Sequence, residues 1–179
     1  TVVITGANSG IGFEAAKILI KLGAHIIMAC RNIGRAENAK KCLLDENPSG
    51  IVDILQLDLA DFDSINAFIN RIKTSNLHID YFYNNAGVFR IPNSKTKQGY
   101  EIVLGTNLFG TFYLNKKLCD YFCDSGEKIK IIFTTSITAH INKINYNDPF
   151  FENHKYRKYK AYGSSKRGNS HIFQYFLEN

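Results

Sequence analysis

The chain has 179 residues, of which 45% are hydrophobic and 21% charged, and it carries a net charge of +6. This length fits one domain with a sizeable core, and no apolar run approaches the roughly 18 residues that a membrane-spanning helix needs. No nucleic-acid recognition motif accompanies the dispersed basic residues, so we exclude a nucleic-acid partner; an anionic ligand, a membrane surface or plain solubility remains to explain the charge.

Strand patterns and helix patterns alternate along the chain. Short apolar runs predict strands at residues 2–5, 24–30, 51–57, 79–83 and 129–134. Longer segments predict helices at residues 10–22, 31–47, 61–75, 98–123 (with a break near Gly105) and 161–177. This order predicts an α/β fold, a doubly wound parallel sheet with helices on both faces, in one domain over residues 1–179.

The first twelve residues, TVVITGANSGIG, place a glycine turn between the first strand and the first helix. The residues Gly6, Gly10 and Gly12 lack a Cβ, so the backbone turns sharply and a pyrophosphate can approach it. The N-terminus of the helix then offers free N–H groups to that anion. The alternative is a tight strand-to-helix turn that binds nothing.

Three further segments follow the ends of predicted strands, where ligands bind in parallel sheets. Arg31 suits the 2′-phosphate of NADP better than the free ribose of NAD, although a solvated arginine is the alternative. Asp58 could bind the adenine amino group, or it could cap the next helix. The segment NNAG at residues 84–87 has small side chains that let a cofactor lie against the backbone.

A second group of residues is typical of proton transfer. Tyr162 and Lys166 form Y-x-x-x-K, and residues four apart share one face of a helix. A nearby ammonium favours the phenolate form of a tyrosine. Ser136 could hydrogen-bond a carbonyl or alcohol, and Asn107 lies where the predicted helix is interrupted, so its amide could hold a water in a proton relay.

Together, TGANSGIG, NNAG, Asn107, Ser136 and YGSSK occur in an order that resembles the short-chain dehydrogenase/reductase family. The resemblance covers essentially all 179 residues. The segments ACRN, NNAGV and TSITAH, with the long insert before AYGSSK, are similar to the retinol dehydrogenase branch and to the oxidoreductase domain of WW domain-containing oxidoreductases. The fold that this implies is a Rossmann-type NAD(P)-binding domain.

The resemblance also implies roles for particular residues. Tyr162 is expected to be the general acid/base, Lys166 to hold the nicotinamide ribose, and Ser136 to orient the carbonyl. Asn107 is expected to complete the proton relay. The residues expected at the NADP site, besides Tyr162 and Lys166, are Gly6, Asn8, Ser9, Gly10, Ile11, Gly12, Arg31, Asp58, Leu59, Asn85, Ala86 and Gly87.

The implied function is NADP-dependent hydride transfer between nicotinamide and an alcohol or carbonyl, with an apolar substrate such as a retinoid, a steroid or a lipid aldehyde. NAD is the less favoured cofactor, and an oligomer is compatible with the sequence. The chain ends before the family's sixth and seventh strands and substrate loop, so we expect a C-terminally truncated sheet and a longer gene product. The alternative function is a catalytically weak or inactive nucleotide-binding interaction module.

Two further features concern the environment of the chain. Residues 137–160 carry aromatic and basic side chains that could frame an apolar substrate mouth or contact a membrane surface; an ordinary solvated loop is the alternative. The cysteines Cys30, Cys42, Cys119 and Cys123 lack metal-site spacing, so we predict no metal and reduced, core-facing thiols in a reducing intracellular compartment. The expected location is the cytoplasm or the endoplasmic-reticulum membrane. Association with that membrane would use segments outside this chain.

Overall fold

The computed structural model describes residues 1–75 and 77–178. The described residues divide into two compact units. We call residues 1–58, 63–86 and 117–134 the sheet unit, and residues 59–62, 87–116 and 135–178 the helical unit. The expectation of one domain over residues 1–179 stays a prediction.

The sheet unit is built on parallel strands, whose order among the described residues is β3-β2-β1-β4-β5. These strands are β1 (Val2–Thr5), β2 (Ile26–Cys30), β3 (Val52–Gln56), β4 (Tyr81–Asn84) and β5 (Lys130–Phe133). All residues of β1 are buried, as the continuous apolar run predicted for a central strand. The strand order and the parallel pairing confirm the predicted doubly wound sheet.

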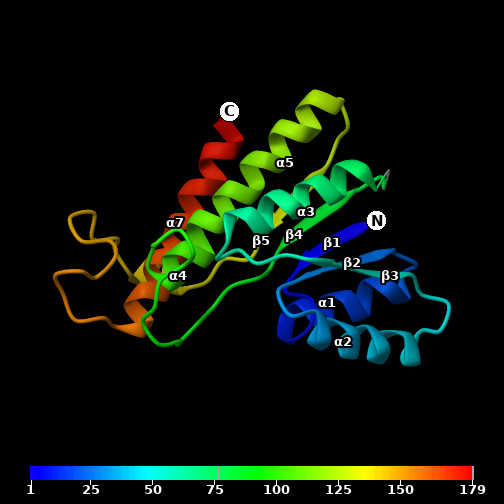
Figure 1. The fold of residues 1–179 in the computed structure, drawn as a ribbon, viewed down its shortest axis with the longest axis horizontal. Coiled ribbons are helices and arrows are strands. Elements are labelled where there is room, and N and C mark those ends of the chain that lie inside the picture. The colour runs from blue at the N-terminus through cyan, green and yellow to red at the C-terminus, as the bar shows by residue number, and fades with distance from the viewer. Residues whose placement is uncertain (76, 179) are drawn as a thin grey trace. The chain divides into compact units, whose positions relative to one another are not determined.

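Helices cover both faces of this sheet (Figure 1). On one side lie α1 (Gly10–Lys21) and α2 (Ile33–Glu46), and on the other lie residues 63–74 of α3 (Phe62–Thr74) and residues 117–125 of α5 (Thr111–Ser125). In register with Val3 of β1, Phe82 of β4 contacts Phe68 of α3, with ring centroids 6.3 Å apart. Because alternate residues of a strand face opposite sides, this contact fixes α3 on the Val3 face.

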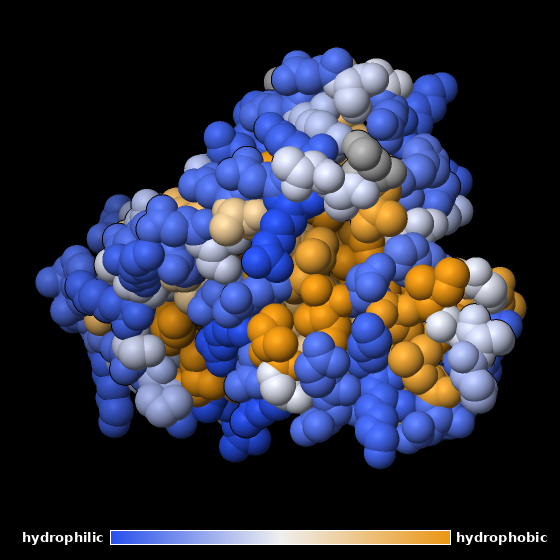
Figure 2. Space-filling model, turned by 45° about the vertical axis from the view of Figure 1, so that its right-hand side comes forward, coloured by the Kyte–Doolittle hydropathy of each residue, from blue (hydrophilic) through white to orange (hydrophobic). Residues whose placement is uncertain are grey.

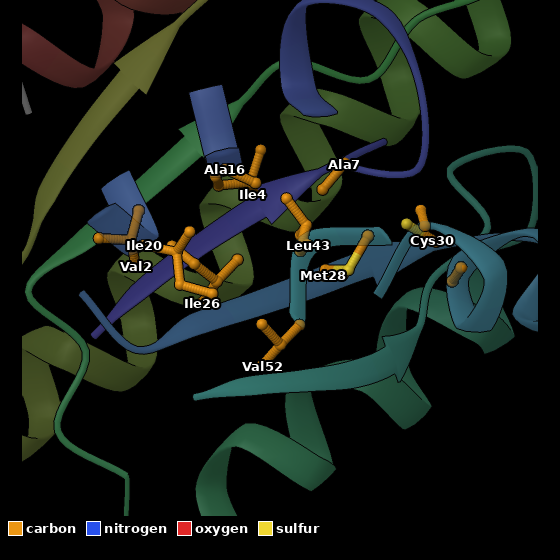
Figure 3. Close-up of a cluster of buried hydrophobic side chains, with 12 residues drawn as sticks. Val2, Ile4, Ala7, Ala16, Ile20, Ile26, Met28, Cys30, Leu43 and Val52 are labelled. Atoms are coloured by element: carbon orange, nitrogen blue, oxygen red, sulfur yellow. The ribbon is translucent and has the colours of Figure 1, made fainter. Parts of the chain in front are cut away.

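The opposite face of the sheet carries a cluster of buried hydrophobic side chains (Figure 3). Ile4 and Met28 are register neighbours on β1 and β2, and both are fully buried. Ala16 and Ile20 of α1 and Leu43 of α2 close the cluster from the helix side. Burying one aliphatic side chain of this size contributes about 1.5–3 kcal/mol, so the cluster holds the strand ends that precede the candidate site.

The observed elements end within a few residues of the predicted bounds, and two of the differences have a clear cause. The second strand begins at Ile26 and not at residue 24, because the N–H of Ala24 donates to the carbonyl of Leu19 and closes the end of α1. The helix predicted from residue 31 begins at Ile33, because the Asn32 side chain caps it by accepting the N–H of Arg35 at 2.9 Å.

The helical unit contains α4 (Ile102–Leu104), the π-helix η1 (Gly105–Gly110), residues 111–116 of α5, α6 (Thr138–Ile141) and α7 (Lys158–Glu178). The helix predicted from residue 98 begins at Ile102, because the buried Glu101 carboxylate accepts the N–H groups of Val103 and Leu104 at 2.8 Å. At Gly105 the helix changes to wider π turns and does not break, which corrects the predicted interruption. The last helix begins at Lys158 and not at residue 161.

The insert at residues 137–160 has a mixed character. Phe150 contacts Tyr100 and Phe109, with ring centroids 5.8 and 6.0 Å apart, so this part packs onto the helical unit. Tyr146 and Tyr159, in contrast, are 74% and 59% exposed. The predicted role of the insert as a substrate mouth stays a prediction.

The surface shows patches of hydrophobic side chains between hydrophilic ones on the face that Figure 2 displays. Among the described helices, none has the length and apolar character to cross a membrane.

The prediction that the thiols face the core holds for Cys30, which is buried, but is wrong for Cys42 and Cys123, which are exposed. These two cysteines lie on α2 and α5, at positions of the two helices that solvent reaches.

Candidate functional site

The glycine turn follows β1 directly and opens α1. Gly6 and Gly10 have φ angles of 68° and 56°, a left-handed conformation that glycine adopts without strain. Ser9 precedes α1 with an extended backbone and caps no N–H group through its side chain, and the first turn of the described helix holds no acidic residue. The N-terminus of α1 therefore keeps its N–H groups and its positive dipole end for an external anion.

A buried threonine ties this turn to the end of β4. The Thr5 hydroxyl accepts the N–H groups of Asn85 and Ala86 at 3.0 and 2.9 Å, and the Asn85 side-chain amide donates to the Thr5 carbonyl at 2.9 Å. The same amide covers Gly12 so closely that a Cβ there would lie 2.4 Å from Asn85 Nδ2. The structure thus brings together the predicted residues Gly6, Gly12, Asn85 and Ala86, and it adds Thr5, which the sequence analysis missed.

A cavity of about 380 Å³ lies beside the turn, lined by Asn8, Ser9, Phe13, Arg35, Asn38, Ala39 and Cys42. Arg31, the predicted 2′-phosphate ligand, is exposed directly after β2, whereas Arg35 lines the cavity itself. The sequence analysis missed Arg35, although a second arginine four positions after Arg31 was a readable signal. The Arg35 guanidinium and the uncapped N–H groups of α1 are donors that fit a phosphorylated dinucleotide.

The remaining residues predicted to bind the cofactor divide between the two units. Ile11 is 66% exposed on the first turn of α1. Asp58 follows β3 in the sheet unit, and its N–H donates to Ser64 Oγ at 2.9 Å. Leu59 and Gly87 belong to the helical unit, where Leu59 is buried.

Asn107 is a buried polar side chain of the helical unit and is 1% exposed in η1. Its Oδ1 accepts the N–H of Val88 at 2.7 Å, while its Nδ2 donates to the carbonyl of Val88 at 3.0 Å and to Ser165 Oγ at 3.1 Å. The Ser165 hydroxyl donates in turn to the carbonyl of Tyr162 at 2.7 Å. The Asn107 side chain thus clamps the β4–α4 loop and the Y-x-x-x-K helix to each other.

Tyr162 and Lys166 lie one turn apart on α7, as their spacing predicted. The amine of Lys166 lies 5.7 Å from the centre of the Tyr162 ring, and the ring centre of Phe89 lies 4.6 Å from it. Lys166 is 4% exposed, and burial lowers its pKa from the usual value. The helical unit therefore holds an amine and a phenol together in a partly desolvated place.

Ser136 lies after β5 in the segment that leads to α6. Its Oγ accepts the N–H of Thr138 at 3.3 Å and the hydroxyl of Thr138 at 2.9 Å. Within the described residues no hydrogen bond joins Ser136 to Tyr162 or Asn107. Because Ser136 Oγ accepts both contacts, its own hydrogen is left to donate to a carbonyl oxygen.

The chain matches known proteins over nearly its full length. The profile of the short chain dehydrogenase family matches residues 1–148. Short-chain dehydrogenase TIC 32 B, chloroplastic, of Brassica napus is 37% identical, covering 94% of this chain and 55% of the relative. The human WW domain-containing oxidoreductase is also 37% identical over 94% of this chain and 42% of its own length, and human retinol dehydrogenase 13 is 36% identical over 93% and 50%.

Solved structures agree with this match. An uncharacterized protein from Mycobacterium paratuberculosis superposes with a TM-score of 0.81 at 30% identity, covering 99% of this chain and 62% of that one. A short-chain dehydrogenase from Sphingobium yanoikuyae in complex with NADPH gives 0.74 at 26% identity, covering 99% and 64%. The chain spans about half the length of the curated relatives it matches. On its sequence, its fold and these relatives, the chain belongs to the short-chain dehydrogenase family.

Proposed function

We propose that the protein carrying this chain is an NADP-dependent oxidoreductase that interconverts an alcohol and its carbonyl. The observation that carries the proposal is the buried clamp of Asn107, Ser165 and the Tyr162 carbonyl, with Lys166 on the same helix. Such a clamp fixes the position of the Tyr162 phenol without using its hydroxyl. The phenol is thereby kept for proton transfer to or from the substrate.

The residues of the helical unit divide the work of that transfer. Tyr162 gives or takes the proton at the substrate oxygen, and Ser136 donates a hydrogen bond to the same oxygen. The Lys166 ammonium stabilises the phenolate that Tyr162 becomes. Asn107 positions the helix that carries Tyr162 and Lys166, and we keep for it the proposed part in a proton relay. Bound NADP supplies the hydride acceptor, or in its reduced form the hydride donor.

The sheet unit is proposed to bind the cofactor. The N–H groups of the first turn of α1 are free to meet the pyrophosphate, and the space beside Gly10, where a Cβ would meet nothing within 4 Å, is open to it. Arg31 and Arg35 are proposed to meet the 2′-phosphate, which favours NADP over NAD. We further propose an apolar substrate such as a retinoid, steroid or lipid aldehyde. We also propose a reducing intracellular compartment, and the free exposed thiols of Cys42 and Cys123 support this location.

The test measures NADPH oxidation by the full-length protein with retinal, a steroid ketone and a long-chain aldehyde. We expect Tyr162→Phe to lower kcat/KM by about 10²- to 10⁴-fold, because the phenol is the proton donor. Tyr146→Phe is the matched control, since Tyr146 is an exposed tyrosine of the same unit. Full turnover by Tyr162→Phe would refute the assignment.

A second arm addresses the cofactor. Arg35→Ala and Arg31→Ala are each expected to weaken NADPH binding about tenfold, because each removes a charged hydrogen bond to the 2′-phosphate. Binding of NADH should not change, since NADH lacks that phosphate. Tight NADPH binding by the wild-type protein without turnover of any substrate favours the other function, a nucleotide-binding interaction module.

A further inference from the structure

A second, larger cavity of about 850 Å³ lies within the helical unit. The residues that line it are Arg90, Asn142, Arg157, Lys158, Tyr159 and Lys160. The charged side chains of this lining are all cations. None of these four cations forms an ion pair within the part of the chain that the structure describes. The cavity therefore concentrates positive charge that the surrounding protein does not neutralise.

Most of the cations of this cavity lie where the helix dipole of α7 disfavours positive charge. Three of the cations lie at the start of α7, which begins at Lys158 and has no acidic residue in its first turn. The N-terminus of a helix carries the positive end of the dipole, so acidic side chains are favoured there and basic ones are disfavoured. Arg157, Lys158 and Lys160 thus add positive charge where the helix already has it. An anion in the cavity would relieve both sources of repulsion.

The fourth cation, Arg90, has a strained backbone conformation. Arg90 has a φ of 58°, in the left-handed region that residues with a Cβ rarely adopt. The Arg90 guanidinium lies over the ring of Tyr159, 5.4 Å from the ring centre. A strained residue persists only where its surroundings hold it, and such residues concentrate at binding sites. Strain at Arg90 and charge at α7 are independent observations about the same cavity.

An aromatic wall connects the cavity to the proposed proton donor. The ring of Tyr159 contacts Phe89 with centroids 5.4 Å apart, and Phe89 contacts Tyr162 at 4.6 Å. A ligand whose anionic end lies among the cations can therefore lay an apolar body along Phe89 toward Tyr162. This geometry favours a ligand that enters the cavity over a flat, charged lipid surface.

We propose that this cavity binds the carboxylate or phosphate end of an otherwise apolar alcohol or carbonyl substrate. The inference rests on the proposed function and makes its substrate class more specific. The anionic end sets the position of the substrate, and Arg90, Arg157, Lys158 and Lys160 determine the preference for it. A neutral substrate of the same length lacks this anchor.

The experiment compares an ω-oxo fatty acid with the alkanal of the same carbon number, using the full-length protein and NADPH. We expect a lower KM for the ω-oxo acid, and Arg157→Gln with Lys158→Gln is expected to raise that KM about tenfold and to leave the KM of the alkanal unchanged. Lys155→Gln is the matched control, because it removes an exposed cation of the same segment that does not line the cavity. Sodium chloride at high concentration should abolish the preference of the wild-type protein.

A binding measurement separates this inference from the proposed function. Calorimetry in the presence of NADPH compares an ω-hydroxy fatty acid with the alkanol, a pair that cannot turn over with the reduced cofactor. Selective binding of the acid without turnover of any carbonyl supports the anion site and overturns the enzyme assignment. Equal KM values for the two carbonyls overturn the anion site alone. Loss of binding to phosphatidylserine vesicles in the double variant, with unchanged KM, also overturns it and assigns the cations to a membrane surface.

Discussion

The sheet unit and the helical unit build their candidate sites from different atoms. In the sheet unit the site consists mainly of backbone: the left-handed Gly6 and Gly10, the uncapped first turn of α1, and Gly12 beneath Asn85. In the helical unit the site consists of side chains, with Asn107, Ser165, Tyr162 and Lys166 buried or half-buried on η1 and α7.

This difference teaches what each site needs from the sequence. A backbone site depends on where side chains are absent, so a short local pattern specifies it. A side-chain site depends on partners that meet across the chain; the hydrogen bond between Asn107 and Ser165 joins residues 58 positions apart. Substitutions should therefore act differently on the two units, and the following predictions test this from the largest expected effect to the smallest.

Gly110→Ala tests an exception to this difference between the units, because at Gly110 the folding of the helical unit also depends on the absence of a side chain. A Cβ at Gly110 would lie 2.1 Å from the backbone carbonyl oxygen of Leu59, which cannot move aside as a side chain can. We expect a loss of about 3 kcal/mol in the free energy of unfolding, or failure to fold, measured by urea denaturation. Gly34→Ala is the control, since its Cβ meets only an ordinary contact on α2 and should be neutral or stabilising. Equal stability of the two variants would contradict the close approach.

Asn107→Ala and Asn85→Ala sharpen the comparison with the same substitution in each unit. Asn107→Ala removes the side-chain partner of both backbone groups of Val88 and one of the two partners of the Ser165 hydroxyl, so we expect a loss of about 2–3 kcal/mol. Asn85→Ala removes one side-chain bond to Thr5 and keeps the two backbone N–H bonds, so we expect about 1 kcal/mol. Thermal denaturation measures both. A larger loss at Asn85 would reverse the distinction between the units.

Alkylation of exposed thiols tests whether a dinucleotide covers the sheet-unit cavity. Cys42 lines that cavity, while Cys123 is exposed elsewhere in the same unit and provides an internal control. We expect saturating NADPH to slow the reaction of Cys42 with N-ethylmaleimide about tenfold and to leave Cys123 unaffected, as followed by peptide mass spectrometry. Equal protection of both thiols would indicate a general stabilisation and not a covered cavity.

We predict that the thermal stability of the protein depends on pH through Asp148 of the insert. The hydrogen bond from His154, with Asp148 Oδ2 and His154 Nδ1 2.6 Å apart, and the N–H groups of Glu152 and Asn153 hold the pKa of Asp148 below its usual range. A lowered carboxyl pKa contributes stability that is present above the usual pKa near 4 and is lost as the pH falls through the lowered value. We therefore expect Asp148→Asn to lower Tm by about 2 °C at pH 7, with the difference disappearing as the pH falls through the lowered pKa of Asp148. Glu152→Gln should follow the wild-type profile; a pH-independent difference at Asp148 would contradict the role of its charge.

Much of the fold was readable because its signals are local. Continuous apolar runs identified the strands, and the glycine turn between β1 and α1 identified the edge of the sheet where the candidate cofactor residues lie. Element ends were less accurate, because caps such as Asn32 and Glu101 decide them through single side-chain hydrogen bonds. The π turns of η1 were read as a break, since a glycine pattern alone does not distinguish a wider helix from an ended one.

By itself, the sequence determined the alternation of strand and helix, the glycine turn, and the position of Tyr162 and Lys166 one turn apart on a helix, because spacing along one chain encodes these features directly. The joint role of Asn107, Ser136, Tyr162 and Lys166 stays a prediction from the family resemblance. Only the tertiary structure decided that Asn107 clamps Val88 to Ser165, that Arg35 lines the smaller cavity, and that Arg90 joins the cations of α7. These contacts depend on side-chain direction and on loops that cross between elements. The periods of 2 and 3.6 residues predict which face of a strand or helix a residue lies on, but not which distant residue it contacts. These contacts are therefore known only from the packed structure.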